Sequence, residues 1–311
     1  MASPKFEQRV DALRKSVKIS PKALIGTIYG DMLVPHGGTV WLASLVGLAD
    51  RFGVAEYLAR TSALRLVHDG WLHPTRIGKF SFYSMTEEHV LRLKKHYPRV
   101  YGPPVLSWSG TWYILLAGVS GLNAKQLGNL WSELRWNGVG RLSSDIFISA
   151  AESIEAVEFL FQELDLRERI EVMRAESILP KDENLLRGIV KKAWDIPRIA
   201  ALYERFLSRF RPFWLDLDRG FVPDGETAFI LRTLLIHEYR SAVLQDPRLP
   251  KDLLPDPWAG MSAFTLCKSI YQALLQPSEA FLRDHVRSAD GPMGDAGDLL
   301  YQRFGGLSPI A

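Results

Sequence analysis

Apolar positions recur at helical spacing three times in the first seventy residues of this chain. The first stripe covers residues 24–33, with Ser20 placed as an N-cap and Pro21 at the favoured first helical position. A second helix is expected over 39–53, ending at a glycine, and a third over 54–70, also ending at a glycine. The chain therefore begins with three short amphipathic helices.

The pattern changes after the third helix. Residues 71–86, WLHPTRIGKFSFYSMT, contain two short apolar segments around a basic, glycine-containing tip, which predicts a strand, a turn and a second strand. One more amphipathic helix runs from 86 to Pro103-Pro104, a linker. Three helices followed by a two-stranded hairpin are typical of a winged helix-turn-helix.

The middle of the chain predicts the element order β-α-β-β-α-β, which is that of a ferredoxin-like domain. The expected elements are a strand at 110–119, a helix at 122–136, a hairpin at 138–149, a helix at 153–166 and a strand at 169–178. Beyond residue 180 the pattern is mostly helical. The fold class is α+β, with an N-terminal arm at 1–20, a winged helix-turn-helix at 21–102, a ferredoxin-like coupling or dimerisation domain at 105–178 and a helical effector or dimerisation domain at 180–311.

The net charge of +3 is divided unevenly along the chain. Residues 1–100 contain 15 Lys and Arg against 8 Asp and Glu, whereas the remaining residues contain 23 against 27. A basic first third joined to a mildly acidic remainder favours a module that binds a polyanion, attached to a body that does not.

The composition places few other limits on the chain. Hydrophobic residues make up 47% and charged residues 23%, as in an ordinary globular protein. No apolar run approaches the ~20 residues of a membrane helix, and the N-terminal segment is too charged for a signal peptide. The single cysteine, Cys267, cannot form an internal disulfide. We expect a cytoplasmic protein with no membrane contact.

The third helix has two faces of different chemistry. One face carries small or apolar residues that suit packing on the first two helices: Ala59, Ser62, Ala63, Leu66 and Val67. The other face carries Arg60, Thr61, Leu64, Arg65 and His68. Arginine can pair with guanine, threonine can contact base or phosphate, and leucine can contact a thymine methyl. We therefore expect this face to bind double-stranded DNA, although Leu64 could instead belong to the core.

Two cations lie at the tip of the hairpin. Arg76 and Lys79 flank Gly78, where they are expected to contact the DNA backbone or the minor groove. An alternative is that the winged helix is a docking surface of a non-enzymatic protein-interaction scaffold.

Several segments of the chain resemble the PaaX family of phenylacetic-acid-degradation repressors. They are IYGD (28–31), GGTVWLASL (37–45), RTSALRL (60–66), DGWL (69–72), RIGKFSFY (76–83), SGTW (109–112), LRWNGVG (134–140), KKAWDI (191–196), IHEYR (236–240), DPRLPKDLLPDPWAG (246–260) and LYQRFGGL (300–307). The hairpin departs from the expected pattern, since it has RIGK where a more arginine-rich RxGR is expected.

The resemblance implies a homodimeric bacterial transcriptional repressor that binds a palindromic operator and releases it on binding an aryl-coenzyme A thioester, such as phenylacetyl-coenzyme A. That ligand requires an apolar slot for the aryl group and cations for the phosphates. The candidate residues for effector binding are His237, Tyr239, Arg240, Lys191, Lys192 and Trp258. The aromatic residues of the last third lie at helical spacings and are expected to be mostly core, with one or two lining a pocket: Trp194, Tyr203, Phe206, Phe210, Tyr239, Trp258 and Tyr271.

Motifs for catalysis are incomplete, and we expect no enzymatic activity, metal site or cofactor. His237 and Glu238 begin a His-Glu-x-x-His pattern, but Ser241 occupies the position of the second histidine. Gly138 and Gly140 lack the third glycine of a dinucleotide loop. The ferredoxin-like middle also resembles the metal-dependent nucleases of CRISPR adaptation, but its first strand has no carboxylate to hold a metal.

Overall fold

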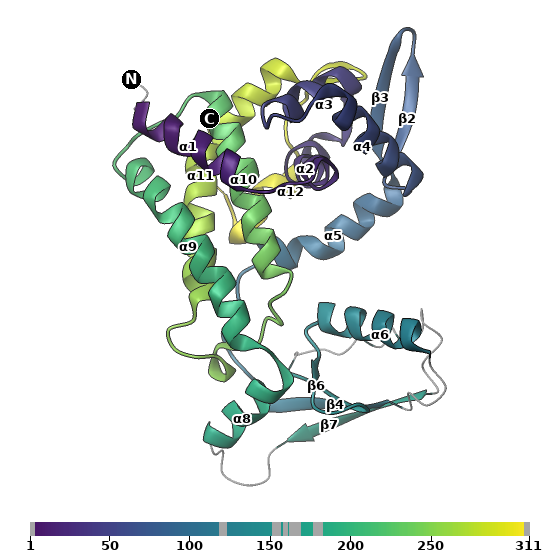
Figure 1. Ribbon diagram of the computed structural model, residues 1–311, viewed down its shortest axis with the longest axis vertical. Coiled ribbons are helices and arrows are strands. Elements are labelled where there is room, and N and C mark those ends of the chain that lie inside the picture. The colour runs from purple at the N-terminus through teal and green to yellow at the C-terminus, as the bar shows by residue number, and fades with distance from the viewer. Residues whose placement is uncertain are drawn as a thin grey trace. The chain divides into compact units, whose positions relative to one another are not determined.

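The computed structural model describes residues 4–117, 123–150, 157, 161, 169–176 and 183–307 (Figure 1). Helices and strands are mixed, as the α+β prediction requires. The chain forms two compact units. The first contains residues 1–103, 207–240 and 264–311, and the second contains residues 104–206 and 241–263.

The first unit contains the winged helix. Its elements are α2 (Pro21–Ile28), a π-helical turn (Tyr29–Leu33), a 3-10 turn (Val34–His36), β1 (Thr39–Trp41), α3 (Leu42–Asp50), α4 (Glu56–His68), β2 (Leu72–Ile77), β3 (Phe80–Met85) and α5 (Glu87–Tyr101). The start of α2 is as predicted, because the Ser20 hydroxyl accepts a hydrogen bond from the backbone N–H of Ala23 and Pro21 opens the helix.

The prediction of a helix starting at residue 39 is wrong at its first turn. Thr39–Trp41 is a strand, and it pairs antiparallel with Phe82–Ser84 of β3. The strand order is therefore β1-β3-β2. β-branched and aromatic side chains favour the extended backbone, and the partner strand lies about forty residues away in the chain, beyond the reach of a local pattern.

The predicted hairpin is confirmed. β2 and β3 pair from Leu72 opposite Met85 to Ile77 opposite Phe80. Gly78 has φ +59 in the two-residue turn between them, a conformation that favours glycine. The hairpin extends beside α4 (Figure 1).

The predicted N-terminal arm contains a packed helix, α1 (Pro4–Ser16). The Phe6 side chain is fully buried and its ring contacts Phe213 and Phe221, and Arg9 forms an ion pair with Asp216. These partners lie about 200 residues further along the chain, so the segment alone gave no sign of them.

The rest of the first unit comes from the C-terminal third. It contains residues 207–218 of α9 (Ile196–Asp218), 225–240 of α10 (Gly225–Val243), 264–285 of α11 (Ala259–His285), β8 (Arg287–Ser288), β9 (Gly291–Pro292), α12 (Asp298–Tyr301) and a 3-10 turn (Arg303–Gly305). Phe229, Phe281 and Met293 belong to the same hydrophobic core as Leu24, Ile28, Leu45 and Leu66 of the winged helix. The winged helix is therefore continuous in its core with α10 and α11.

The second unit contains the ferredoxin-like sheet. Its described elements are β4 (Thr111–Ala117), α6 (Ala124–Trp136), β5 (Gly140–Arg141), β6 (Ile146–Ser149) and β7 (Ile170–Glu176). The strands are antiparallel in the order β5-β6-β4-β7, which matches the predicted topology. The predicted helix at 153–166 lies outside the described residues except for Val157 and Phe161, which are buried and helical. This unit also contains α8 (Glu183–Ala193) and a 3-10 turn (Lys251–Leu253).

Candidate nucleic-acid interface

The helix α4 has one buried face. Ala59, Ser62, Ala63 and Leu66 are buried, and α4 packs on α2 and α3. Small side chains at i, i+3 and i+4 allow close approach of the helices, and together with the apolar residue at i+7 they fix the rotation of α4 about its axis. That rotation determines which residues lie on the opposite face.

The opposite face of α4 is accessible. Arg60, Thr61, Leu64, Arg65 and His68 are all exposed, and we call these five residues the recognition face. Leu64 is 57% exposed, so the alternative that placed it in the core is wrong. An exposed leucine between two arginines suits a partner that offers both methyl groups and hydrogen-bond acceptors.

The two arginines of the recognition face differ in their local partners. The Arg60 guanidinium donates to Glu56 at 2.8 Å, one helical turn earlier. The side chain of Arg65 has no hydrogen-bond or ion-pair partner among the residues that the structure describes. Its guanidinium is therefore available to a ligand without loss of an internal contact.

Asp69, the carboxylate beside the recognition face, forms an ion pair with a lysine. Lys22 of α2 forms an ion pair with Asp69, and His68 Nδ1 lies 3.5 Å from the other carboxylate oxygen. The hydrogen bond from Lys22, followed by that from His68, lowers the pKa of Asp69. The negative charge of Asp69 is thus offset where a polyanion would approach.

The tip of the hairpin, residues 76–80, is exposed throughout, and we call it the wing tip. Arg76 Nε donates to the carbonyl oxygen of Gly78 at 3.3 Å, and Lys79 Nζ lies 5.5 Å from the centre of the Phe80 ring. Neither cation is paired with a carboxylate among the described residues. No acidic residue occurs between Asp69 and Glu87 in the sequence.

The structure adds Tyr57 to the surface predicted from the sequence. Its side chain is 68% exposed in the first turn of α4, and its carbonyl oxygen accepts a hydrogen bond from Thr61 at 2.7 Å. Tyr57 precedes Thr61 by four residues and Leu64 by seven, so helical periodicity could have identified it.

The six candidate effector residues are divided between the two units. His237, Tyr239 and Arg240 of α10 belong to the first unit, and Lys191, Lys192 and Trp258 belong to the second. Tyr239 and Trp258 are buried, whereas both lysines are exposed in the last turn of α8. All seven of the C-terminal aromatic residues expected in the core are buried: Trp194, Tyr203, Phe206, Phe210, Tyr239, Trp258 and Tyr271.

His237 contacts the winged helix. Its Nδ1 atom lies 3.4 Å from the hydroxyl of Thr27 in α2. Burial and then the charge of Arg240 lower the pKa of His237, against the opposing effect of Glu238. A neutral ring hydrogen-bonded to Thr27 gives His237 a structural contact between α10 and the winged helix.

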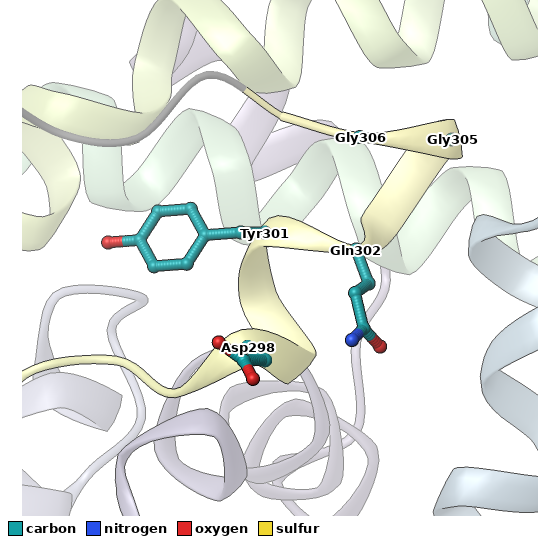
Figure 2. A pocket seen from close by; sticks show the side chains of 5 residues that line it. All are labelled: Asp298, Tyr301, Gln302, Gly305 and Gly306. Atoms are coloured by element: carbon teal, nitrogen blue, oxygen red, sulfur yellow. The ribbon is translucent and has the colours of Figure 1, made fainter.

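A surface recess of about 380 Å³ lies on the C-terminal segment. It is lined by Asp298, Tyr301, Gln302, Gly305 and Gly306, from α12 and the turn after it (Figure 2). None of the six candidate effector residues lines this recess. It has no cation for a phosphate, so it does not meet the requirements of a coenzyme A thioester.

A group of buried charges joins the winged helix to the C-terminal helices. Asp31, in the π-helical turn, accepts hydrogen bonds from Arg232 Nε of α10 at 3.0 Å and from Arg303 Nη1 at 2.9 Å. Arg232 also forms an ion pair with Glu279 of α11. We call Asp31, Arg232, Glu279 and Arg303 the buried ion cluster. Asp31 and Arg303 lie in the IYGD and LYQRFGGL segments, but sequence reasoning did not connect them.

Neither a metal site nor a membrane span is found in the described part of the chain. No group of three or more His, Cys, Asp or Glu is placed to hold a metal ion there. The strand that would carry a nuclease carboxylate, β4, has the sequence TWYILLA. No described helix combines the length and the hydropathy needed to cross a bilayer.

Three family models match consecutive parts of the chain. Residues 20–89 match the model described as PaaX-like protein, residues 106–186 match the PaaX protein central Cas2-like domain, and residues 194–284 match the PaaX-like protein C-terminal domain. The second description agrees with the predicted likeness of the middle domain to the proteins of CRISPR adaptation.

One curated relative and one solved structure extend the comparison. The chain is 34% identical over 294 residues to the transcriptional repressor PaaX of Escherichia coli, covering 94% of this chain and 92% of the relative. It is also similar in fold to an uncharacterized protein of Mycobacterium tuberculosis, with a TM-score of 0.51 and 20% identity over 76% of this chain and 89% of that one.

Proposed function

The chain belongs to the PaaX family and is a PaaX-like transcriptional repressor, and from this premise we propose that it controls genes for the degradation of aromatic acids of the phenylacetate type. The curated relative is a transcriptional repressor, so the proposal is one of regulation without catalysis. The observation that carries it is the exposed recognition face, with Arg65 free of internal partners among the described residues.

In the proposed complex, α4 lies in the major groove of the operator. Arg65 then donates to a guanine, Thr61 contacts a base or phosphate, and Leu64 contacts a thymine methyl. Lys79 and Arg76 of the wing tip contact the flanking backbone, which adds affinity that falls as salt concentration rises.

One winged helix offers a small contact area, so the proposed repressor is a two-fold homodimer on a palindromic operator. Two copies of α4 then contact half-sites about one helical turn, ~34 Å, or a multiple of it apart. Light scattering at micromolar concentration tests this, with two chains per duplex expected. A monomer that binds the duplex with a stoichiometry of one contradicts it.

The proposed effector is an aryl-coenzyme A thioester such as phenylacetyl-coenzyme A. Induction requires that this ligand bind the DNA-incompetent arrangement more tightly, by a coupling of ~1–3 kcal/mol or more. Lys191 and Lys192 are exposed cations suited to phosphates, and Arg240 and His237 are the candidates on α10. By reciprocity, DNA must weaken effector binding by the same factor.

The DNA half of the proposal is tested by selecting duplexes from a random pool with the wild-type protein and comparing their sequences with the region upstream of its own gene. A shared palindromic motif is expected. Binding without any base preference, together with capture of a protein partner by the recognition face, favours the interaction scaffold instead.

The effector half is tested by calorimetry with phenylacetyl-coenzyme A, phenylacetate and coenzyme A, followed by DNA titration with each ligand present. The thioester is expected to bind best and to weaken DNA binding. If it binds no better than coenzyme A, or leaves DNA affinity unchanged, the inducer belongs to another chemical class and the DNA-binding half of the proposal remains.

A further inference from the structure

The outer face of the three-stranded sheet carries an apolar row. In the register of the sheet, Trp41 lies opposite Phe82, and Phe80 lies opposite Ile77. Directly opposite residues, and residues two apart on one strand, share a face, so these four side chains lie on the same side of the sheet. The other side carries Tyr83 and its neighbours in the hydrophobic core.

Two members of this row remain accessible at the wing tip. Ile77 is 47% exposed and Phe80 is 41% exposed. Phe80 is held in place, because its ring makes an edge-to-face contact with Trp41 at 5.3 Å between ring centres. Ile77 lies on the adjacent strand, directly across from this fixed ring. The wing tip thus ends in a preorganised apolar pair rather than in polar turn residues alone.

The charges around this pair identify its partner. Arg76 and Lys79 are adjacent to Ile77 and Phe80 in the sequence, and no acidic residue occurs from Gly70 to Thr86. An apolar protein surface would leave both cations desolvated without counter-charges. The minor groove of DNA instead offers phosphates on both rims and the apolar edges of deoxyribose and stacked bases between them. The hairpin also follows α4 directly in the chain, and its strand β2 contacts α4.

We propose that Ile77 and Phe80 form an apolar wedge that enters the minor groove next to the half-site bound by α4, and that it bends the operator there. This inference rests on the proposed function, since it concerns the same DNA complex. Phe80 supports Ile77, which contacts the base step, while Arg76 and Lys79 neutralise the two rims. Pyrimidine–purine steps unstack most easily. The wedge therefore favours operators that have such a step beneath it, at a position where the protein donates no hydrogen bond to a base.

The test uses the full-length protein and the duplex that it selects from a random pool. Ile77→Thr keeps a β-branched side chain in the strand and removes part of the apolar contact. Val222→Thr is the matched control, because Val222 is 71% exposed between α9 and α10 and has no place in the wedge. Thermal unfolding of both variants checks that the fold is retained.

Affinity is measured by fluorescence anisotropy and the bend by phased gel electrophoresis. Wild-type protein and Val222→Thr are expected to bend the duplex equally. Ile77→Thr is expected to bind roughly 5- to 10-fold more weakly, with a smaller bend, from the loss of apolar burial alone. Replacing the flexible step beneath the wing by an A-tract is expected to weaken wild-type binding more than it weakens Ile77→Thr binding.

The outcomes separate the two proposals. Wild-type binding to a selected duplex with no bend, or with a bend that Ile77→Thr leaves unchanged, overturns the wedge and leaves the repressor proposal intact. Equal affinity loss in Ile77→Thr and Val222→Thr also overturns it. Failure of the wild-type protein to select any duplex overturns both.

Discussion

Arg232 of α10 donates through Nε to a carboxylate oxygen of Asp31 at 3.0 Å, and both side chains are almost fully excluded from solvent. Asp31 lies in the π-helical turn that follows the first helix of the winged helix. Tyr101 and Tyr271 also donate to this carboxylate, at 2.7 and 3.1 Å. Among the described residues of the winged helix, Asp31 is thus the one fully buried carboxylate. Most of the hydrogen bonds that it accepts come from the C-terminal third of the chain.

Removing one partner of this pair is expected to destabilise the protein strongly. Arg232→Met keeps an unbranched side chain but leaves Glu279 and Asp31 with less positive charge around them. The expected loss of unfolding free energy is ~3–5 kcal/mol, as for other broken buried ion pairs. Chemical denaturation followed by circular dichroism measures it.

Arg51→Met is the control for that measurement. Arg51 Nε lies 3.2 Å from Glu226, also between the winged helix and α10, but these side chains are 34% and 46% exposed. Solvent screens such a pair, so a loss below about 1 kcal/mol is expected. Similar losses in the two variants would show that burial does not determine the contribution of these ion pairs.

The same cluster makes stability depend on acid. Burial alone would raise the pKa of Glu279, but Arg232 and then His36 lower it to about 2. His36 Nε2 lies 2.8 Å from the Glu279 carboxylate. Because the folded-state pKa lies below the ordinary value of 4.5, the stabilisation is present above pH 4.5 and is lost as the pH falls toward 2.

Glu279→Gln is therefore expected to flatten the fall in thermal midpoint between about pH 5 and pH 2.5, while lowering the midpoint at neutral pH. Differential scanning calorimetry across this range measures both effects. An unchanged slope in Glu279→Gln would mean that other carboxylates govern the acid sensitivity.

The features that were predicted correctly are those that depend on residues close together in the sequence. The N-cap at Ser20, the turn at Gly78 and the two faces of α4 all follow from spacing and side-chain chemistry within a few residues. The order of the ferredoxin-like strands followed from the order of elements along the chain. Tyr57, the exposed residue beside the recognition face that the sequence analysis did not name, lies on the same helical period as Thr61 and Leu64.

The missed features depend on partners far away in the sequence. Thr39–Trp41 became a strand because β3 offers it a free edge, and α1 packs because Phe6 meets Phe213. Asp31 has its guanidinium partners 201 and 272 residues away. One sequence contains no record of such pairings, so residues 1–20 were interpreted as an arm and Asp31 was not identified as a buried ion-pair partner.

The unequal environments of two arginines on α4 give a prediction about base preference. Arg65 has no internal partner among the described residues, so Arg65→Ala is expected to cost ~1–3 kcal/mol on the selected duplex and to relax preference at one base pair. Arg60 is engaged with Glu56, and Arg60→Ala is expected to cost less. Anisotropy on the selected duplex and on a random duplex measures both variants. Equal losses on the two duplexes for Arg65→Ala would exclude it as a base-contacting residue.

Lys79 is expected to contribute without base preference. In the proposed complex Lys79 contacts phosphate, so Lys79→Ala should weaken selected and random duplexes alike and reduce the slope of log affinity against log salt by about one unit. Titrations at several salt concentrations measure the slope. A loss confined to the selected duplex would place Lys79 on a base edge instead.

The shared core leads to a prediction about the winged helix taken alone. Phe229, Phe281 and Met293 pack in the same core as α2, α3 and α4, so a fragment ending at Pro103 would expose the apolar surface that they cover. It would also leave Asp31 without Arg232 and Arg303, and an unpaired buried carboxylate must either become hydrated or be protonated. The fragment of residues 1–103 is therefore expected to show helical circular dichroism without a cooperative thermal transition, and to bind the selected duplex far more weakly than the full chain.

The Asp31→Asn variant separates the effect of the charge from that of the apolar surface. In the fragment, this change is expected to restore part of the ordered structure, because it removes the unpaired charge. In the full chain, the same change is expected to be destabilising, because it leaves two buried guanidinium groups short of negative charge. A fragment that unfolds cooperatively and binds as tightly as the full chain would show that the winged helix is independent of the C-terminal helices, and that the buried ion cluster is not needed to hold it in its DNA-binding form.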